Sequence, residues 1–217
     1  MEGQLKLELA ILVFVLILAR VLYVIHKITT GFSRTASSKR VRPCKTVICI
    51  GSGGHTTEMI NLLSTIDFTR YSPRYYFLAF SDKTSYTKVK NLEDSKENDS
   101  YKIIKIPRSR NVGQFYHTSV FTTLFSTLYT IPFILKIRPD LILCNGPGTC
   151  IPICLVGFLL KVAFITDTRI VFIESFCRTE TFSLTGKILV YFADNFLVQW
   201  PRLKQKLRRA EYIGQLM

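Results

Sequence analysis

Thr46-Val-Ile-Cys-Ile50 is followed directly by Gly51-Ser-Gly-Gly-His-Thr-Thr-Glu58, so a run of strand-forming residues gives way to a glycine-rich turn. Glycines let the backbone turn tightly and approach a ligand closely. A helix that begins after such a turn has unpaired amides with a partial positive charge, which bind anions. We therefore predict a phosphate or diphosphate site formed by Gly51, Ser52, Gly53 and Gly54.

Short apolar runs alternate with helical stretches along the rest of the chain. The predicted strands are Lys45–Ile50, Arg74–Phe80, Tyr101–Ile106, Leu141–Cys144, Ile170–Glu174 and Phe196–Trp200. The predicted helices are His55–Ile66, Phe115–Ile137, Cys150–Ala163 and Leu184–Phe192. Parallel strands need crossover helices, which cover both faces of the sheet. The alternation predicts an α/β domain with a single doubly wound, Rossmann-like parallel sheet. The polar stretch Lys83–Ser100 is expected to be a solvated loop.

Two further loops are expected at the same edge of this sheet, because ligands of doubly wound sheets bind at the carboxyl ends of the strands. A second glycine turn follows Leu141–Cys144, and two glycine turns on one rim are expected to hold two phosphates of one group. Arg108 and Arg110 are candidates for the same diphosphate, although a solvated basic loop is an alternative interpretation. The second turn contributes Asn145, Gly146, Gly148 and Thr149.

Other phosphate-binding and metal-binding patterns fit the sequence less well. The first turn has Thr56 where the dinucleotide fingerprint G-x-G-x-x-G has its third glycine, and the chain has no G-x-x-x-x-G-K-[ST] loop. Its six cysteines form no C-x-x-C pair, and Asp167 has no acidic neighbour with which to bind a metal. We expect no cofactor, no metal site, and buried thiols in a reducing compartment.

Length and charge narrow the partners. A chain of 217 residues has room for one ordinary domain. Its formal net charge of +14 favours anionic partners such as lipid headgroups, phosphorylated substrates or nucleic acid. Nucleic acid is not expected as a partner, because the sequence carries no recognisable motif for it beyond the charge.

The N-terminal region carries a candidate membrane anchor. Leu9–Ile25 is apolar except for Arg20, which is expected to snorkel, and as a helix it is just long enough to span a bilayer. Basic residues crowd its C-terminal side, which predicts a cytosolic main domain. The expected organisation is an anchor over residues 1–28, a basic linker over 29–43 and a Rossmann-like domain over 44–217. A buried helix of the globular domain is the alternative interpretation.

Phe115–Ile137 is also strongly apolar. It is apolar enough to lie on a membrane surface, and core packing on one face is the competing interpretation. Pro132 is expected to interrupt it, which argues against a second full span. We therefore expect a single-pass protein.

Several motifs match one family in order and spacing. They are Gly51-Ser-Gly-Gly-His-Thr-Thr-Glu58, Pro107-Arg-Ser-Arg110, Leu143-Cys-Asn-Gly-Pro-Gly-Thr-Cys150 with Pro152, Glu174-Ser175 and Val198-Gln-Trp-Pro201. From Val41 onward, and in its N-terminal anchor, the sequence resembles the membrane-anchoring subunits of the UDP-N-acetylglucosamine transferase that makes dolichyl-diphospho-chitobiose in asparagine-linked glycosylation.

The resemblance implies one half of a split GT-B glycosyltransferase, a two-domain enzyme type. This chain would bind the acceptor, dolichyl-diphosphate-N-acetylglucosamine, on the cytosolic face of the endoplasmic reticulum membrane. A soluble partner subunit would bind the UDP-sugar, and this chain alone would be inactive. In such subunits the extreme C-terminus docks onto the partner, which makes Ile213, Leu216 and Met217 candidates for that contact.

Transfer of a sugar to the acceptor hydroxyl needs a general base, and His55 and Glu174 are the candidates on the predicted rim. An imidazole titrates near physiological pH, whereas a carboxyl group needs a raised pKa for this task. The sequence does not rank the two residues. Glu58 is expected mainly to cap the first helix after the glycine turn. A membrane receptor that recruits a soluble enzyme without contributing a catalytic group is the alternative function.

Overall fold

The computed structural model describes residues 2–30, 42–96, 100–111 and 113–216. The helices are α1 (Glu2–Thr29), α2 (Gly54–Thr65), α3 (Lys83–Asp94), α4 (Tyr116–Ile137), α5 (Cys150–Val162), α6 (Leu184–Leu189) and α7 (Pro201–Lys206). The strands are β1 (Thr46–Cys49), β2 (Arg74–Ala79), β3 (Tyr101–Ile106), β4 (Leu141–Asn145), β5 (Arg169–Ile173), β6 (Asn195–Val198) and β7 (Ala210–Tyr212).

The strands form one parallel sheet in the order β3-β2-β1-β4-β5-β6-β7. The chain first winds outward from β1 to β3, then returns to the other side of β1 and winds outward again from β4. The predicted doubly wound α/β fold is therefore confirmed. The direction of winding reverses between β1 and β4, where Cys49 pairs with Cys144. This pairing sets the two glycine turns side by side, at the position where such sheets bind ligands.

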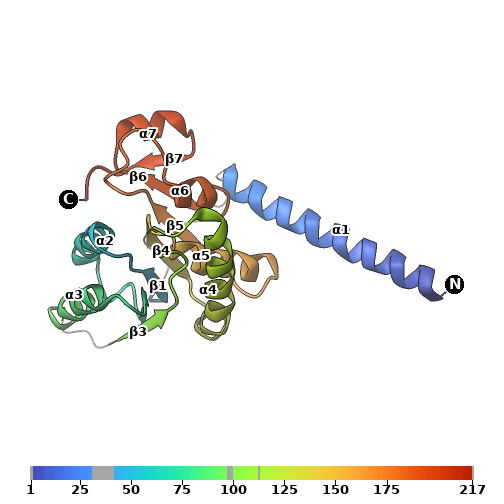
Figure 1. Ribbon diagram of the computed structural model, residues 1–217, viewed down its shortest axis with the longest axis horizontal. Helices are drawn as coiled ribbons and strands as arrows, with labels where there is room; N and C mark the ends of the chain where they lie inside the picture. Colours follow the sequence, from blue (N-terminus) through green and yellow to red (C-terminus); the bar gives the residue numbers. More distant parts are fainter. Residues whose placement is uncertain (1, 31–41, 97–99, 112, 217) are drawn as a thin grey trace.

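Helices cover both faces of the sheet, as Figure 1 shows. Side chains that alternate along β1 pack on opposite faces, with Val47 and Cys49 in one apolar cluster and Ile48 and Ile50 in the other. The first cluster includes residues of α4 and α5 and the C-terminal end of α1, and the second includes residues of α2 and α3. Both cores are therefore built from alternating apolar residues on the same strands.

The expectation of a solvated loop over Lys83–Ser100 is wrong, because Lys83–Asp94 forms α3. The Asp82 side chain caps this helix by accepting a hydrogen bond from the Ser85 amide, 3.0 Å away. Val89 and Leu92 are buried against the sheet. Two apolar side chains one turn apart give too weak a period to be recognised in a polar sequence.

The basic segment that begins at Pro201 is part of the fold. It forms α7 and β7, and β7 pairs with β6 at the edge of the sheet. Leu203 and Ala210 are fully buried and attach this segment to the core. Because charged residues lie between Leu203 and Ala210, the sequence shows no apolar pattern that identifies these two residues as part of the core.

Helix α1 leaves the domain and projects away from it (Figure 1). It is long and apolar enough to span a membrane, and most of its surface is exposed. Its C-terminal part packs on the domain through buried Val24 and Ile28. Arg20 does not extend along the helix to water. Instead, its Nε donates to the Val162 carbonyl at the end of α5, and its guanidinium lies over Phe164. The C-terminal part of α1 is therefore docked onto the domain. The expected linker falls largely on residues 31–41, outside the described part.

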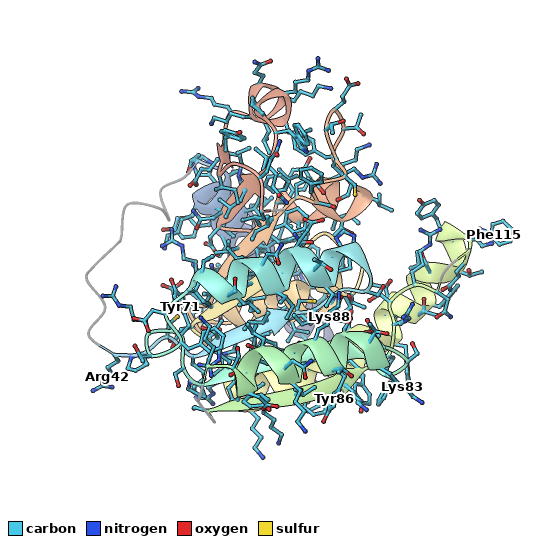
Figure 2. The ribbon with its side chains drawn as sticks, turned by 90° about the vertical axis from the view of Figure 1, so that its left-hand side faces the viewer. Arg42, Tyr71, Lys83, Tyr86, Lys88 and Phe115 are labelled. Carbon is cyan, nitrogen blue, oxygen red and sulfur yellow. The ribbon has the colours of Figure 1, made fainter. Side chains whose placement is uncertain are left out.

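Helix α4 runs from Tyr116 to Ile137 without a break, so the expected interruption at Pro132 is wrong. Neighbouring Ile131, Phe133 and Ile134 pack against the core and stabilise the helix at this position. α4 is the second helix long and apolar enough to cross a membrane, but this applies to its length and composition only. Its N-terminal end, which begins next to Phe115, extends beyond the domain body (Figure 2).

Candidate functional site

A cleft of about 970 Å³ opens at the carboxyl edge of the sheet, where β1 and β4 meet. Its walls come from the two glycine turns, the loop after β3, the N-terminal half of α4 and the segment after β5. The lining includes Gly51, Ser52, Gly54, His55, Glu58, Arg108, Ser109, Arg110, Tyr116, Val120, Leu124, Gly146, Gly148, Thr149 and Ser175. Of the predicted diphosphate-binding residues, all but Gly53 and Asn145 line this one cleft.

The first glycine turn leads directly into α2 and leaves its N-terminus open toward the cleft. Gly53 adopts φ +63°, and no side chain caps the helix. The Thr56 hydroxyl donates to the Gly51 carbonyl at 2.8 Å, which closes the turn from inside. Threonine thus has a structural role where the dinucleotide fingerprint has its third glycine. The turn presents backbone amides with a partial positive charge to the cleft.

The two glycine turns follow the neighbouring strands β1 and β4 and contact each other. A Cβ atom at Gly51 would lie 2.8 Å from Pro147 Cγ, so a larger residue has no room there. Gly146 adopts φ +61° and lies under the His55 imidazole ring. His55 Nδ1 is 2.9 Å from Asn145 Oδ1. His55, one of the two predicted base candidates, therefore contacts the second glycine turn.

Replacing Gly146 by alanine is expected to destabilise the protein and displace His55. The new Cβ would lie 2.7 Å from His55 Nδ1, and a non-glycine residue is strained at φ +61°. We expect a cost of about 1–3 kcal/mol in the free energy of unfolding. Denaturant unfolding of the purified chain measures it. Gly148→Ala is the matched control, since no atom lies within 4 Å of its added Cβ and its φ is not in the left-handed region.

Glu58 is buried and does not cap α2, so the expected capping role is wrong. Its carboxylate accepts hydrogen bonds from Asn145 Nδ2 at 2.9 Å and Ser175 Oγ at 2.9 Å. It also accepts from the Phe176 amide at 3.1 Å and from Gln199 Nε2 at 2.9 Å. The side chain therefore points inward from α2 and joins the ends of β4, β5 and β6.

Glu174 is fully buried at the end of β5, beside the cleft but not in its lining. Its carboxylate accepts hydrogen bonds from the Ser175 amide at 3.1 Å and the Ser183 amide at 3.0 Å. Burial raises the pKa of this carboxyl, while the hydrogen bonds from Ser183 and Ser175 oppose that rise. These bonds hold the segment from Ser175 to Ser183, which forms one wall of the cleft.

Three buried polar atoms in the cleft lining have no hydrogen-bond partner, namely Arg108 Nε, Ser109 Oγ and Thr149 Oγ1. Buried polar groups without partners are rare, and a bound ligand is one way to satisfy them. Arg110 lies closer to solvent, where its guanidinium stacks on Tyr116 at 4.1 Å and its Nε donates to the Gln114 carbonyl. Arg108 and Thr149 were predicted for this site, and Ser109 was not.

Apolar side chains of α4 continue the cleft toward solvent. Tyr116, Val120 and Leu124 line it, and they are also exposed. Phe121 and Phe125, on the same part of the helix, are 75% and 61% exposed. This exposed half of α4 projects from the body (Figure 2), so an apolar surface leads from the outside of the molecule into the polar end of the cleft.

The C-terminal segment forms hydrogen bonds with residues next to this cleft. The Leu216 amide donates to Gln199 Oε1 at 2.9 Å, and Asn61 Nδ2 donates to the Leu216 carbonyl at 3.1 Å. Leu216 is half-buried, whereas Ile213 is 39% exposed beside the edge strand β7. Of the predicted partner contacts, Ile213 is thus available at the surface. Met217 lies outside the described residues.

The part of the chain that the structure describes groups no three His, Cys, Asp or Glu side chains in a way that could hold a metal ion. Four buried cysteines lie beneath the glycine turns, and Cys144 Sγ is 3.4 Å from Cys154 Sγ. Burial raises the pKa of the Cys150 thiol well above its usual range. These thiols pack as core side chains.

The doubly wound parallel sheet has the fold of one domain of a GT-B glycosyltransferase. The chain resembles MurG of Acinetobacter baumannii with a TM-score of 0.56 at 14% identity, over 79% of this chain and 45% of that one. It also resembles the glycotransferase of kitacinnamycin, with a TM-score of 0.52 at 12% identity, over 80% of this chain and 52% of that one. The chain thus spans about half the length of these enzymes.

Residues 46–216 match the family described as "Oligosaccharide biosynthesis protein Alg14 like". The chain belongs to this family, and the predicted resemblance is confirmed. It is 46% identical to the UDP-N-acetylglucosamine transferase subunit ALG14 of Mus musculus, over 79% of this chain and 82% of the relative. It is 41% identical to the subunit of the same name from Yarrowia lipolytica, over 94% of this chain and 95% of the relative.

Proposed function

We propose that this chain is the membrane subunit of a heteromeric UDP-N-acetylglucosamine transferase. It binds dolichyl-diphosphate-N-acetylglucosamine and takes part in adding the second N-acetylglucosamine, on the cytosolic face of the endoplasmic reticulum membrane. One observation carries the proposal. A single cleft has a glycine rim and basic side chains suited to a diphosphate at one end, and an exposed apolar helix suited to a lipid at the other.

The polar end of the cleft suits a diphosphate. The open N-terminus of α2 and the amides of the second glycine turn supply neutral donors, and Arg108 supplies a positive charge. The unpartnered Ser109 and Thr149 hydroxyls are further donors. This arrangement gives the expected diphosphate-binding residues a common ligand.

The apolar end suits a polyprenyl chain. The exposed half of α4 carries Val120, Phe121, Leu124 and Phe125, which are all more than half exposed. A lipid diphosphate held at the glycine turns can lie along this surface while its tail remains in the bilayer. Helix α1, with His26 and Lys27 in its last turn, anchors the chain and places the domain on the cytosolic side.

In this proposal the reaction is divided between two subunits. The chain aligns with 45% of the MurG chain, and the UDP-sugar site belongs to a soluble partner subunit. The active centre then forms between the two subunits, and neither is active alone. The relatives' names support this view, since they describe subunits of a UDP-N-acetylglucosamine transferase.

His55 is the better placed of the two base candidates. It lines the cleft, whereas the Glu174 carboxylate is buried outside the lining and already accepts several hydrogen bonds. In the proposed reaction His55 Nε2 accepts the proton of the acceptor hydroxyl. The hydroxyl oxygen then bonds to the anomeric carbon of the donor sugar, and the bond from that carbon to UDP breaks. Glu174 holds the wall of the cleft.

Reconstitution tests this proposal directly. The chain is combined with a soluble partner, UDP-N-acetylglucosamine and a short-chain lipid diphosphate sugar, and the product is examined for a second sugar. Transfer that requires both proteins is expected. If no second sugar is added although both proteins are folded and associated, the proposed function is wrong.

Within the same assay, Arg108→Ala is expected to raise KM for the acceptor about 10- to 100-fold, because a charged hydrogen bond to the diphosphate is lost. KM for the UDP-sugar should not change. Arg202→Ala is the matched control, since Arg202 is exposed and pairs with Glu180, and neither residue belongs to the cleft lining. An unchanged acceptor KM in Arg108→Ala would remove this residue from the diphosphate site.

A further inference from the structure

The Glu58 carboxylate lies at the centre of a buried hydrogen-bonded array that reaches from His55 to the C-terminal residues. All of the groups that contact its oxygens are donors, namely Asn145 Nδ2, Ser175 Oγ, the Phe176 amide and Gln199 Nε2. These partners lie 87 to 141 residues further along the chain. Because an ionised carboxylate can only accept hydrogen bonds, it dictates the orientation of every polar group around it.

The first consequence concerns Asn145. Only its amide nitrogen can donate to Glu58, so its Oδ1 must face His55, where it lies 2.9 Å from Nδ1. A flipped Asn145 amide would bring two oxygens together at Glu58. Since Oδ1 is an acceptor, His55 Nδ1 must carry the proton of the neutral ring. His55 Nε2 is then left with its lone pair.

The second consequence concerns Gln199. Its Nε2 donates to Glu58 and to the Glu174 carbonyl at 3.0 Å, so its Oε1 must face the other way. There it accepts a hydrogen bond from the Leu216 amide at 2.9 Å. The side-chain amides of Asn145 and Gln199 therefore each have one allowed orientation. That of Gln199 is fixed both by Glu58 and by the C-terminal segment.

We propose that Glu58 is a positioning residue that holds His55, through Asn145, in the tautomer with its proton on Nδ1, and that Gln199 ties this array to residues 213–216. A base needs its lone pair toward the substrate, so the array keeps His55 ready to accept a proton at Nε2. The tie to Leu216 makes the state of His55 depend on the seating of the C-terminal segment, which is the proposed partner-docking element. This inference rests on the proposed function only for the identity of the reaction.

The wild-type chain gives the first test. Full-length protein labelled with ¹⁵N-histidine in detergent micelles contains three histidines, and His55→Gln identifies the signal of interest. Ring ¹⁵N shifts distinguish protonated from unprotonated nitrogens. Above the pH at which the ring becomes neutral, we expect His55 to carry its proton on Nδ1. A neutral ring with its proton on Nε2 would overturn the proposal without any variant of Glu58.

Glu58→Gln gives the second test. The introduced amide nitrogen can donate to Asn145 Oδ1, which lets the Asn145 amide turn and donate to His55 Nδ1. We expect a population of His55 with its proton on Nε2, and a kcat at least ~10-fold lower with little change in acceptor KM. The matched control is Glu180→Gln, because Glu180 is exposed. An unchanged tautomer in folded Glu58→Gln protein would show that Glu58 has no such role.

Removal of residues 213–217 tests the tie to the C-terminal segment in the same spectrum. Loss of the Leu216 amide leaves Gln199 Oε1 without this donor, so we expect the His55 signal to shift or split into two tautomers. An unchanged signal would exclude the link through Gln199. The spectra need neither partner nor substrate, so they separate this inference from the proposed transfer reaction, which the reconstitution assay tests.

Discussion

Replacing His55 by alanine is expected to lower kcat about 10²–10⁴-fold, the usual contribution of a positioned general base. The reason is geometric. His55 lines the cleft between the two glycine turns, and its ring is held by Asn145 and by the close approach of Gly146. The reconstituted enzyme with a short-chain lipid acceptor provides the measurement, at saturating concentrations of both substrates.

His117→Ala is the matched control for this substitution. His117 is an exposed histidine on α4 that does not belong to the cleft lining. Binding of the partner should survive in both variants, because neither residue belongs to the proposed partner-docking segment. If His55→Ala retains full turnover, the chain acts as a membrane receptor for the soluble enzyme and contributes no base.

The fold could be predicted because local signals agree with it. The strands are short and separated by helical stretches. Both faces of the sheet are covered, so the central strands β1 and β4 are apolar almost throughout. Where a helix carries few apolar residues the same reasoning fails. Helix α3 is held by Val89, Leu92 and the buried ion pair of Glu93 with Arg74. No local sequence pattern predicts that ion pair.

The site could be predicted in part for a related reason. The glycine turns are local motifs, and the parallel sheet brings His55 and Asn145 to one edge from positions 90 residues apart. The role of Glu58 could not be found, because an acidic residue shortly after the glycine turn is also typical of a capping residue in the sequence. Its hydrogen bonds with Ser175 and Gln199 depend on how the ends of β5 and β6 meet in three dimensions.

Replacing Ile213 by aspartate is expected to weaken binding of the soluble partner at least ~100-fold, so that the two proteins no longer co-purify. Ile213 is 39% exposed next to β7, and its backbone amide donates to the Val198 carbonyl at 3.1 Å. The substitution therefore puts a charge on the proposed contact surface and removes none of the backbone bonds that seat the segment. A charge buried without a partner in an interface costs several times more than the lost apolar contact.

Gln215→Ala is the matched control, because Gln215 is exposed on the same segment and a polar side chain at the rim contributes little to binding. Both variants should remain in the membrane fraction, since α1 is unchanged. The His55 spectrum adds a second readout. If Ile213→Asp abolishes partner binding and leaves that spectrum unchanged, the contact and the array around Glu58 are separate functions of one segment. Full partner binding by Ile213→Asp would place the docking surface elsewhere on the domain.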